Sequence, residues 1–560
     1  MWLPCSILVF LTAVSAFFRW HMPGAPQDDG ILLVAPERFL RGDLPNRDFL
    51  SVYGPGNIWL LAAFYKVFGV SLMTARCVGA LYQSAIVCGV FLVARRVGRF
   101  SGLVCALITL LLLIPLGSAP YAWIGGLGLA TWSLVFTFYG VELSATSAKQ
   151  RLRFFCAGLC AALAVTWRPD LVVALTLFFA FLWRSLSSGQ KKRLLGGIGF
   201  GLLPLSAHLL VVSPQLFIDN CLIEPMLRFG PGRRLAFSSL GFERQLCILV
   251  TSLSAIGILV CGVLSQRNDA SVRAQTPRAQ TPRASAAEAA LGCFCIGLLT
   301  QAWQRSDATH VRCVACIVLA LLPYAIASWW QSHINKRLVE DTAPAPASSC
   351  EDRLFGLPIS DSLRLRIGRW GRERRPRWMA PAVLFILILL APQLFADEYF
   401  QKRNTLPGAA NLSAAYEVRN NRRVFLLDSA TNASDTQATI DFVQSHVASG
   451  RRLFVGERDL SRAKYNDTFW YYLFPDLQPA SYYMELFPHS AKRSGSSLAP
   501  DIATADVLVL TTAYAKYMEP NASLIPGSTV ADQTVHALFR QIYARGSYTV
   551  WVKKRGVNGI

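Results

Sequence analysis

Long apolar stretches, repeated along the first 396 residues, constrain the fold more than any other feature of this sequence. A helix that spans a bilayer needs about 20 predominantly apolar residues, or somewhat fewer where the bilayer thins. Of the 560 residues, 53% are hydrophobic and only 16% are charged, which is far from the balance of a water-soluble protein. We therefore predict about eleven transmembrane helices, at residues 2–18, 71–93, 103–117, 124–143, 154–166, 171–183, 196–213, 246–264, 286–302, 311–329 and 379–396.

The Lys and Arg residues are distributed unequally between the loops on the two sides of these spans. If the N-terminus lies in the cytoplasm, the cytoplasmic loops carry more than twice as many cations as the opposite loops. Cationic loops tend to stay on the cytoplasmic side of a membrane. We therefore predict a multi-pass integral membrane protein with a cytoplasmic N-terminus. The same effect accounts for the net charge of +21 without nucleic acid as a partner.

The chain divides into a membrane module, residues 1–396, and a C-terminal domain, residues 397–560. Within the membrane module, residues 265–285 contain the pentapeptide Ala-Gln-Thr-Pro-Arg twice, and residues 331–378 are basic and rich in Pro and Ser. Both segments are predicted to be cytoplasmic linkers. The C-terminal domain has short β-like runs and one expected helix, which predict a small extracytoplasmic α/β domain. These elements are Val424–Leu427, Leu453–Gly456, Thr436–Ala448, Val507–Thr511 and Tyr548–Val552.

The first outer loop, residues 19–70, is the first polar stretch of the chain. It contains the adjacent carboxylates of Asp28 and Asp29, followed by turn-forming segments at Gly42–Asp48 and Tyr53–Gly56. This loop is too polar to span a bilayer and is predicted to fold outside the cytoplasm. Its last apolar part, residues 57–68, fits either an interfacial helix or the beginning of the next span.

Cations and acids also occur together at the ends of later spans, on the same side of the membrane as the first outer loop. A single pair of this kind commonly caps a helix or extends toward the membrane surface. Because ionised groups near hydrocarbon are costly, several at one level favour a functional site, and an anionic lipid phosphate would require such a convergence. The groups are Arg168 with Asp170, Glu224 with Arg228, and Arg305 with Asp307 and His310.

These residues resemble those of the GT-C superfamily, membrane glycosyltransferases that use polyprenyl-phosphate sugars. The superfamily includes protein O-mannosyltransferases, aminoarabinose transferases and arabinosyltransferases. The resemblance covers roughly residues 1–330 and rests on the pair Asp28-Asp29, the segments Gly42–Asp48 and Tyr53–Gly56, and the boundaries at Arg168–Asp170 and Arg305–His310. Many relatives have Asp-Glu where this chain has Asp-Asp, which leaves open which carboxylate is the base.

The resemblance implies an inverting glycosyltransferase that moves a hexose or pentose from a polyprenyl-phosphate donor. The acceptor would be a hydroxyl of an extracytoplasmic glycan, lipid or protein. Asp28 or Asp29 would be the general base, because a carboxylate within hydrogen-bond reach can accept the hydroxyl proton. The expected donor-phosphate ligands are Arg168, Arg305 and His310. The expected supporting residues are Asp170, Asp307, Glu224 and Arg228.

The sequence leaves a metal requirement open. Carboxylates such as Asp170 and Asp307 would suit Mg²⁺ or Mn²⁺, but no loop has a dedicated metal-binding spacing. His310, Cys313 and Cys316 have helical spacing, yet small thiols in a membrane helix usually serve packing. No cofactor is therefore predicted with certainty.

Two other classes of protein share this composition. A transporter or lipid flippase would show internal repeats or helices broken at mid-membrane, and neither is evident in the sequence. A non-catalytic membrane anchor for residues 397–560 would make the carboxylates of Asp28 and Asp29 dispensable.

Overall fold

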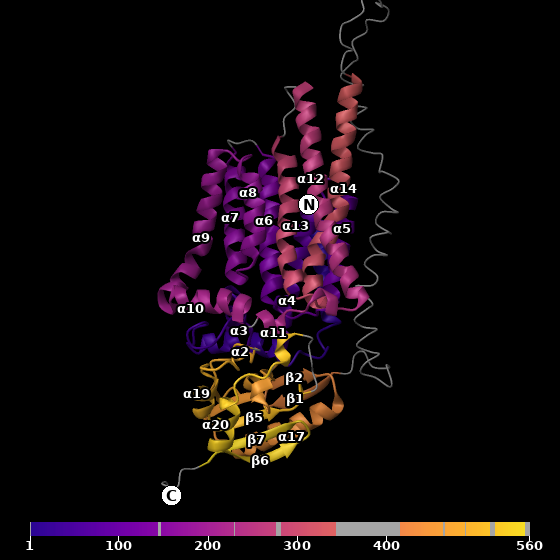
Figure 1. Ribbon diagram of the computed structural model, residues 1–560. Helices are drawn as coiled ribbons and strands as arrows, with labels where there is room; N and C mark the ends of the chain where they lie inside the picture. Colours follow the sequence, from indigo (N-terminus) through magenta and orange to yellow (C-terminus); the bar gives the residue numbers. More distant parts are fainter. Residues whose placement is uncertain are drawn as a thin grey trace, which may run out of the picture.

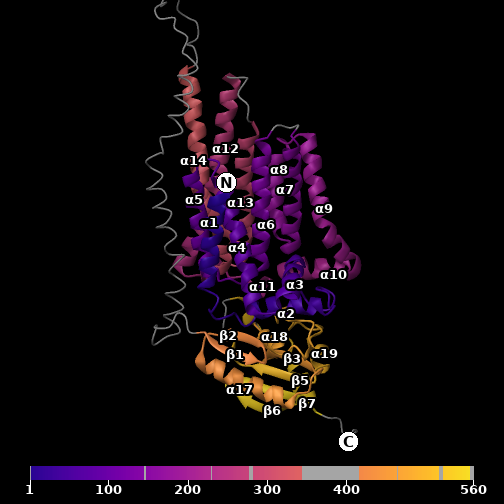
Figure 2. The ribbon, with the colours of Figure 1, turned by 180° about the vertical axis from the view of Figure 1, so that it is seen from behind.

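The computed structural model describes residues 2–143, 147–228, 230–275, 282–342, 415–462, 465–487, 489–515 and 521–554. In these ranges a bundle of long helices meets a smaller domain built on a β-sheet (Figure 1). The expected architecture, a polytopic helical membrane module followed by a C-terminal α/β domain, is confirmed. The smaller domain lies at the end of the bundle that carries the first polar loop, as Figure 2 also shows from behind.

The bundle contains seven helices that are long and apolar enough to cross a membrane, and two shorter apolar ones, α1 and α8, within the described ranges. The chain is thus a multi-pass integral membrane protein. Ten of the predicted spans each coincide with one helix; the eleventh, 379–396, lies outside the described residues. The bundle helices are α1 (Trp2–Phe17), α4 (Leu72–Ala94), α5 (Arg99–Leu113), α6 (Ala122–Val141), α7 (Ala148–Trp167), α8 (Leu171–Trp183), α9 (Ser188–Val212), α12 (Phe242–Gln275), α13 (Pro282–Gln304) and α14 (Ala308–Thr342).

Helices α12 and α14 continue beyond the apolar runs that predicted them. Residues 265–275 and 331–342 are helical, although both belong to segments predicted as linkers. The apolar pattern marks only the part that suits a bilayer, whereas Gln, Arg, Lys and Leu favour helix regardless of hydropathy. Figure 1 shows both helices extending past the rest of the bundle, away from the C-terminal domain.

The first polar loop folds into two short helices, α2 (Asp28–Leu40) and α3 (Gly56–Phe68), which lie across the end of the bundle (Figures 1 and 2). The side chain of Ser71 accepts a hydrogen bond from the Thr74 amide and so starts α4 as a separate helix. Residues 57–68 therefore do not begin the next span, which excludes one of the two alternatives. Between α2 and α3, the Tyr65 hydroxyl donates to the Leu32 carbonyl at 2.9 Å.

A second irregular segment, between α9 and α12, lies at the same end of the bundle. A π-helical stretch in its middle carries the predicted pair of Glu224 and Arg228. Its elements are α10 (Pro214–Ile218), η2 (Asp219–Arg228), α11 (Gly230–Arg233) and η3 (Phe237–Ser239), and a short turn η1 (Ile114–Leu116) follows α5.

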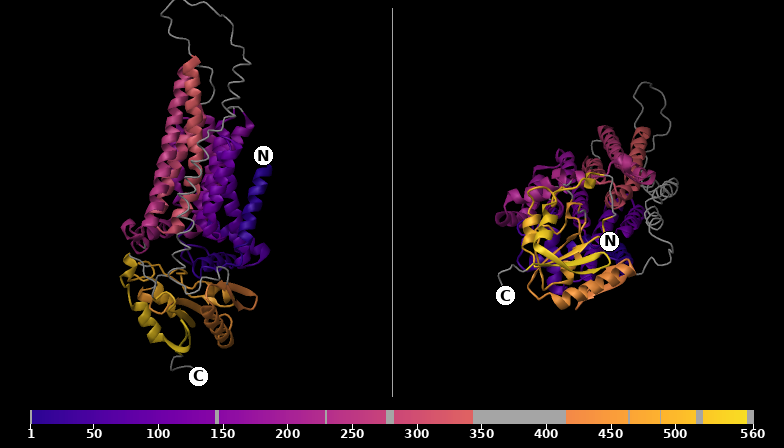
Figure 3. Two further views of the ribbon diagram at one scale, coloured as in Figure 1. Left: turned by 90° about the vertical axis from the view of Figure 1, so that its right-hand side faces the viewer. Right: turned by 60° about the horizontal axis from the view of Figure 1, so that its bottom comes forward.

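The C-terminal domain has a five-stranded mixed sheet in the order β4-β3-β5-β7-β6, and a separate hairpin of β1 and β2. β3 pairs in parallel with β4 and β5, whereas β7 pairs antiparallel with β5 and β6. Figure 3 shows α17 on one side of the sheet. The elements are β1 (Tyr416–Asn420), β2 (Arg423–Leu427), α17 (Ala430–His446), β3 (Arg452–Glu457), η4 (Leu460–Arg462), α18 (Phe469–Leu473), β4 (Gln478–Pro479), α19 (Leu498–Ala503), β5 (Val507–Thr511), η5 (Ala522–Leu524), α20 (Val530–Leu538), β6 (Phe539–Arg545) and β7 (Tyr548–Lys553).

The predicted elements of this domain are all present. The four β-like runs are β2, β3, β5 and β7, and the expected helix is α17, which starts earlier than predicted because Ser429 caps it. The core contains the fully buried side chains of Phe425, Trp470 and Tyr548. The strands β1, β4 and β6 were not predicted; the last two lie at the edges of the sheet, where strands are more exposed and the hydrophobic pattern is weaker.

Candidate active site

A cavity with two adjacent chambers, which share part of their lining, lies where the bundle, the α2–α3 segment and the C-terminal domain meet. Counted with the open solvent at their mouths, the chambers measure about 700 and about 1070 Å³. Both are lined by Tyr53, Arg168, Arg233, Gln301 and His310, which form the boundary between them.

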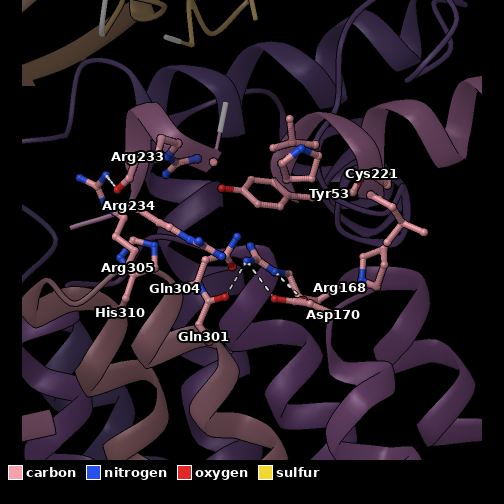
Figure 4. A pocket seen from close by; sticks show the side chains of 15 residues that line it. Tyr53, Arg168, Asp170, Cys221, Arg233, Arg234, Gln301, Gln304, Arg305 and His310 are labelled. Atoms are coloured by element: carbon pink, nitrogen blue, oxygen red, sulfur yellow. Dashed lines mark hydrogen bonds and ion pairs between the residues drawn. The ribbon is translucent and has the colours of Figure 1, made fainter. Parts of the chain in front are cut away.

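We call the first space the cationic chamber. Four arginines and one histidine line it against a single carboxylate, that of Asp170, among the described residues. Figure 4 shows these side chains around a common space. Its polar lining comprises Tyr53, Arg168, Asp170, Arg233, Arg234, Gln301, Gln304, Arg305 and His310.

We call the second space the carboxylate chamber, because Asp28 and Glu485 both line it. Much of its remaining wall is apolar and comes from α2, α3 and the loop between them, and the ends of α6 and α14 also contribute. This wall includes Ile31, Leu32, Ala35, Phe49, Ile58 and Leu61. The chamber therefore combines a largely apolar wall with two carboxyl groups.

Arg168 is held in place from three directions. It follows the last residue of α7, and its guanidinium donates to Asp170 at 2.9 and 3.3 Å and to Gln301 at 3.3 Å. The ring of Tyr53 lies 4.5 Å from the guanidinium carbon, at a cation–π distance. These contacts fix the cation at the boundary of the chambers, where an anion could reach it without rearrangement.

Arg305, Asp307 and His310 form a hydrogen-bonded group at the start of α14. The Asp307 carboxylate accepts from Arg305 Nε at 2.6 Å and from the His310 backbone amide at 2.9 Å, and its Oδ1 lies 2.7 Å from His310 Nδ1. Burial alone would raise the pKa of Asp307, but His310 and Arg305 outweigh it and hold that pKa below its usual range. Asp307 thus stays ionised and orients both partners.

Asp28 is the first residue of α2 and lies in the carboxylate chamber, to which it is exposed. Desolvation by the surrounding protein raises the pKa of Asp28; the charges of Arg233, His310 and Arg305 oppose this shift. A carboxylate with a raised pKa is a stronger base once ionised. Asp28 therefore faces the space in which a substrate hydroxyl could be deprotonated.

Asp29 has a different environment. Its side chain is 5% exposed, lines neither chamber, and accepts from the backbone amide of Ala25 at 3.0 Å. Burial raises the pKa of Asp29 to about 6, although the charge of Arg76 on α4 opposes this. Asp29 thus stabilises the start of α2. The structure places the two carboxylates in different environments, a difference that the sequence does not reveal.

Glu224 and Arg228 lie outside the lining of both chambers, whereas Asp28, Arg168, Asp170, Arg305 and His310 line one or both of them. Glu224 is buried, pairs with Arg228 within η2, and accepts from the Ser490 hydroxyl at 2.6 Å. The pair ties the segment after α9 to the C-terminal domain. The role of this ion pair is therefore structural.

Several cavity residues were not predicted from the sequence as site residues. Arg233 is the last residue of α11 and Arg234 follows it; the preceding Gly230-Pro231-Gly232 is a sequence signal that could have drawn attention to them. Glu485 lies in a loop of the C-terminal domain, with no local motif to mark it. Burial raises the pKa of Glu485 to about 8; Arg233 lowers it and Asp28 raises it further.

Within the described residues, no group of three or more His, Cys, Asp or Glu side chains is arranged to hold a metal ion. His310, Cys313 and Cys316 do not form one: the Cys316 thiol donates to the Cys313 carbonyl at 3.4 Å, as a packing residue does.

No family model matches the sequence, and no curated protein matches it. Solved structures resemble the chain along its whole length. ArnT from Cupriavidus metallidurans bound to undecaprenyl phosphate is 14% identical, covering 99% of this chain and 98% of that one, with a TM-score of 0.48. The Archaeoglobus fulgidus oligosaccharyltransferase AglB in complex with an inhibitory peptide and a dolichol-phosphate is 11% identical, covering 99% and 75%, with a TM-score of 0.45.

The structural neighbours of this chain, across its full length, are thus an ArnT and an archaeal oligosaccharyltransferase. Because identities are low and TM-scores are below 0.5, no residue role is taken from these structures. The function is inferred below from the residues of the cavity.

Proposed function

We propose that this protein is an inverting glycosyltransferase that uses a polyprenyl-phosphate sugar as donor. The observation that carries the proposal is the division of one cavity at the end of a membrane bundle into a cationic and a carboxylate chamber. An anionic leaving group and a hydroxyl nucleophile need these two environments side by side.

The donor phosphate is assigned to the cationic chamber. Arg168 and Arg305 both line the chamber, and each is oriented by an aspartate, Asp170 and Asp307 respectively. Charge-assisted hydrogen bonds of this kind stabilise the charge that develops on a departing phosphate. His310, held by Asp307 through Nδ1, is the third proposed ligand. The polyprenyl chain would lie against apolar surface at the membrane.

Asp28 is assigned as the general base. The acceptor oxygen attacks the anomeric carbon and forms the new glycosidic bond, while the bond from that carbon to the phosphate oxygen breaks and its electron pair leaves with the lipid phosphate. Asp28 takes the hydroxyl proton. A single displacement inverts the anomeric configuration. Asp29, whose carboxylate faces the start of α2, supports the helix that presents Asp28.

The orientation of the chain is part of the proposal. Arg95, Arg96, Arg99 and the cations at the start of α7 and α9 lie at the other end of their helices from the cavity. Such cations favour the cytoplasmic side. We therefore place the cavity and the C-terminal domain outside the cytoplasm, where the acceptor would be an extracytoplasmic glycan, lipid or protein.

The proposal is tested by incubating the purified full-length chain with membrane extracts and a panel of labelled polyprenyl-phosphate pentoses and hexoses. We expect labelled product with at least one donor, release of polyprenyl phosphate, and inversion at the anomeric carbon. The Asp219→Asn variant, which changes a carboxylate of η2 outside the cavity lining, should remain active. Folded wild-type protein that transfers no sugar from any donor, or a product with retained configuration, would overturn the assignment.

A further inference from the structure

The C-terminal domain contacts both ends of α2, the helix that begins with the proposed base. At the first turn, the Asn466 amide donates to the side-chain oxygen of Gln27 at 2.8 Å, and the Phe469 amide donates to the Pro26 carbonyl at 3.1 Å. Figure 2 shows α18, which begins at Phe469, beside α2.

The approach at this end is close enough to require glycine. A Cβ atom on Gly30 would lie 2.4 Å from the Phe469 amide nitrogen, which is backbone and cannot turn aside. Only a residue without a side chain allows the domain to pack this tightly against the first turn of α2. The sequence Asp28-Asp29-Gly30 thus joins the proposed base to a docking contact.

At the other end of α2, Glu37 forms a two-pronged ion pair with Arg423 of β2. Both guanidinium nitrogens lie 2.6 Å from a carboxylate oxygen, and the side chains are only 11% and 17% exposed. Arg423 also donates to the Tyr472 carbonyl at 2.9 Å, and Arg41 donates to Glu37 at 2.6 Å. Bidentate pairs of this kind fix orientation as well as distance.

We propose that the C-terminal domain positions the proposed base, with Glu37 and Arg423 as positioning residues that hold α2 in register with the cavity. The inference rests on the proposed function of Asp28. A rigid helix fixed at both ends keeps its first carboxylate aimed at one point, and small misplacements of a catalytic group cost large factors in rate. The domain is therefore part of the active site's support.

The test compares Arg423→Gln, Glu37→Gln and the double variant in the full-length protein, with Arg545→Gln as the matched control. Arg545 pairs with Asp435 at 2.8 Å inside the C-terminal domain and makes no contact with α2 among the interactions described. We expect each single variant to lower kcat by about ten- to a hundredfold while the KM for the donor changes little. The double variant should resemble the singles, since both remove one interaction.

Hydrogen exchange tests the inference without an activity assay. Amides of α2 should exchange at least about tenfold faster in Arg423→Gln than in wild type, while those of α4 and the Arg545→Gln control stay unchanged. Unchanged exchange in α2 would overturn the inference even if transfer were confirmed. Absence of transfer in wild-type protein would instead count against the proposed function, and the exchange data would still decide whether the domain holds α2. A raised donor KM with an unchanged kcat would also contradict a positioning role.

Discussion

The two chambers of the cavity share a boundary but differ in charge and in origin. The cationic chamber is built by helix ends and loops of the membrane module, and its arginines are oriented by Asp170 and Asp307. The carboxylate chamber combines the first polar loop with Glu485 of the C-terminal domain. Under the proposed function, leaving-group binding resides in the membrane module alone, whereas proton transfer depends on how the two parts meet.

The largest effect is expected from Asp28→Asn, which removes the base and leaves the cationic chamber intact. We expect kcat to fall by about a thousandfold, within the range for loss of a general base, with little change in the KM for the donor. Steady-state kinetics over a range of donor concentrations measure both parameters. Asp219→Asn serves as the control, and a variant that keeps wild-type kcat would remove Asp28 from the mechanism.

The pH dependence of kcat in the wild-type protein is a second test of the role of Asp28. Because desolvation raises the pKa of Asp28 above its ordinary value of 3.8, the proposed base loses its charge at a higher pH than a solvated aspartate. The acid limb of kcat should therefore lie above that value.

A smaller effect is expected from Arg305→Ala, which alters the other chamber. Loss of charge-assisted hydrogen bonds to the phosphate should lower kcat/KM for the donor by about ten- to a hundredfold. Arg305→Lys should recover only part of this loss, since a single ammonium cannot reproduce the planar fork. Arg244→Ala, which removes an exposed cation outside the lining, is the matched control. Equal losses in Arg305→Ala and Arg244→Ala would show that general charge, and not the chamber, attracts the donor.

Glu485→Gln tests whether the C-terminal domain influences the electrostatics of the cavity. The pKa of Glu485 is about 8, so the wild-type side chain is neutral at pH 7 and gains its charge as the pH rises through that value. A new negative charge should repel an anionic donor, and we expect its KM to rise about threefold between pH 7 and pH 9. In Glu485→Gln this rise should be absent. A rise that persists in the variant would assign it to another group.

The smallest effect is expected from Asp29→Asn, and it concerns stability. The pKa of Asp29 is about 6 in the folded protein and 3.8 ordinarily, so the folded state holds this proton more tightly than the unfolded state. The stability contributed by the protonated form is complete below pH 4 and is lost as the pH rises to about 6. Thermal unfolding in detergent should therefore show the Tm of Asp29→Asn rising relative to wild type across this window. A difference in Tm that does not depend on pH would contradict the account.

The sequence predicts the membrane module well because its signal is local. Apolar runs identify ten helices of the bundle, and alternating or buried runs identify β2, β3, β5 and β7. The polar ends of α12 and α14 were taken for linkers because helix propensity, unlike hydropathy, leaves no clear boundary.

The site is less predictable because it depends on direction and on contacts between distant segments. Adjacent side chains on a helix point about 100° apart, so Asp28 and Asp29 have different surroundings. The sequence alone does not distinguish these two residues. Glu224 and Arg228 carry the right charges but lie outside the cavity lining. Glu485 enters the cavity only through docking of the C-terminal domain, which no local pattern reveals.

Equilibrium binding of polyprenyl phosphate, without a sugar, tests the division between the chambers most directly. The wild-type protein would be compared with Arg168→Ala, Arg305→Ala and Asp28→Asn at constant pH and detergent. We predict that both arginine variants bind the lipid phosphate about tenfold more weakly or worse, whereas Asp28→Asn binds it at least as tightly as wild type. Loss of binding in Asp28→Asn together with unchanged binding in the arginine variants would contradict the account.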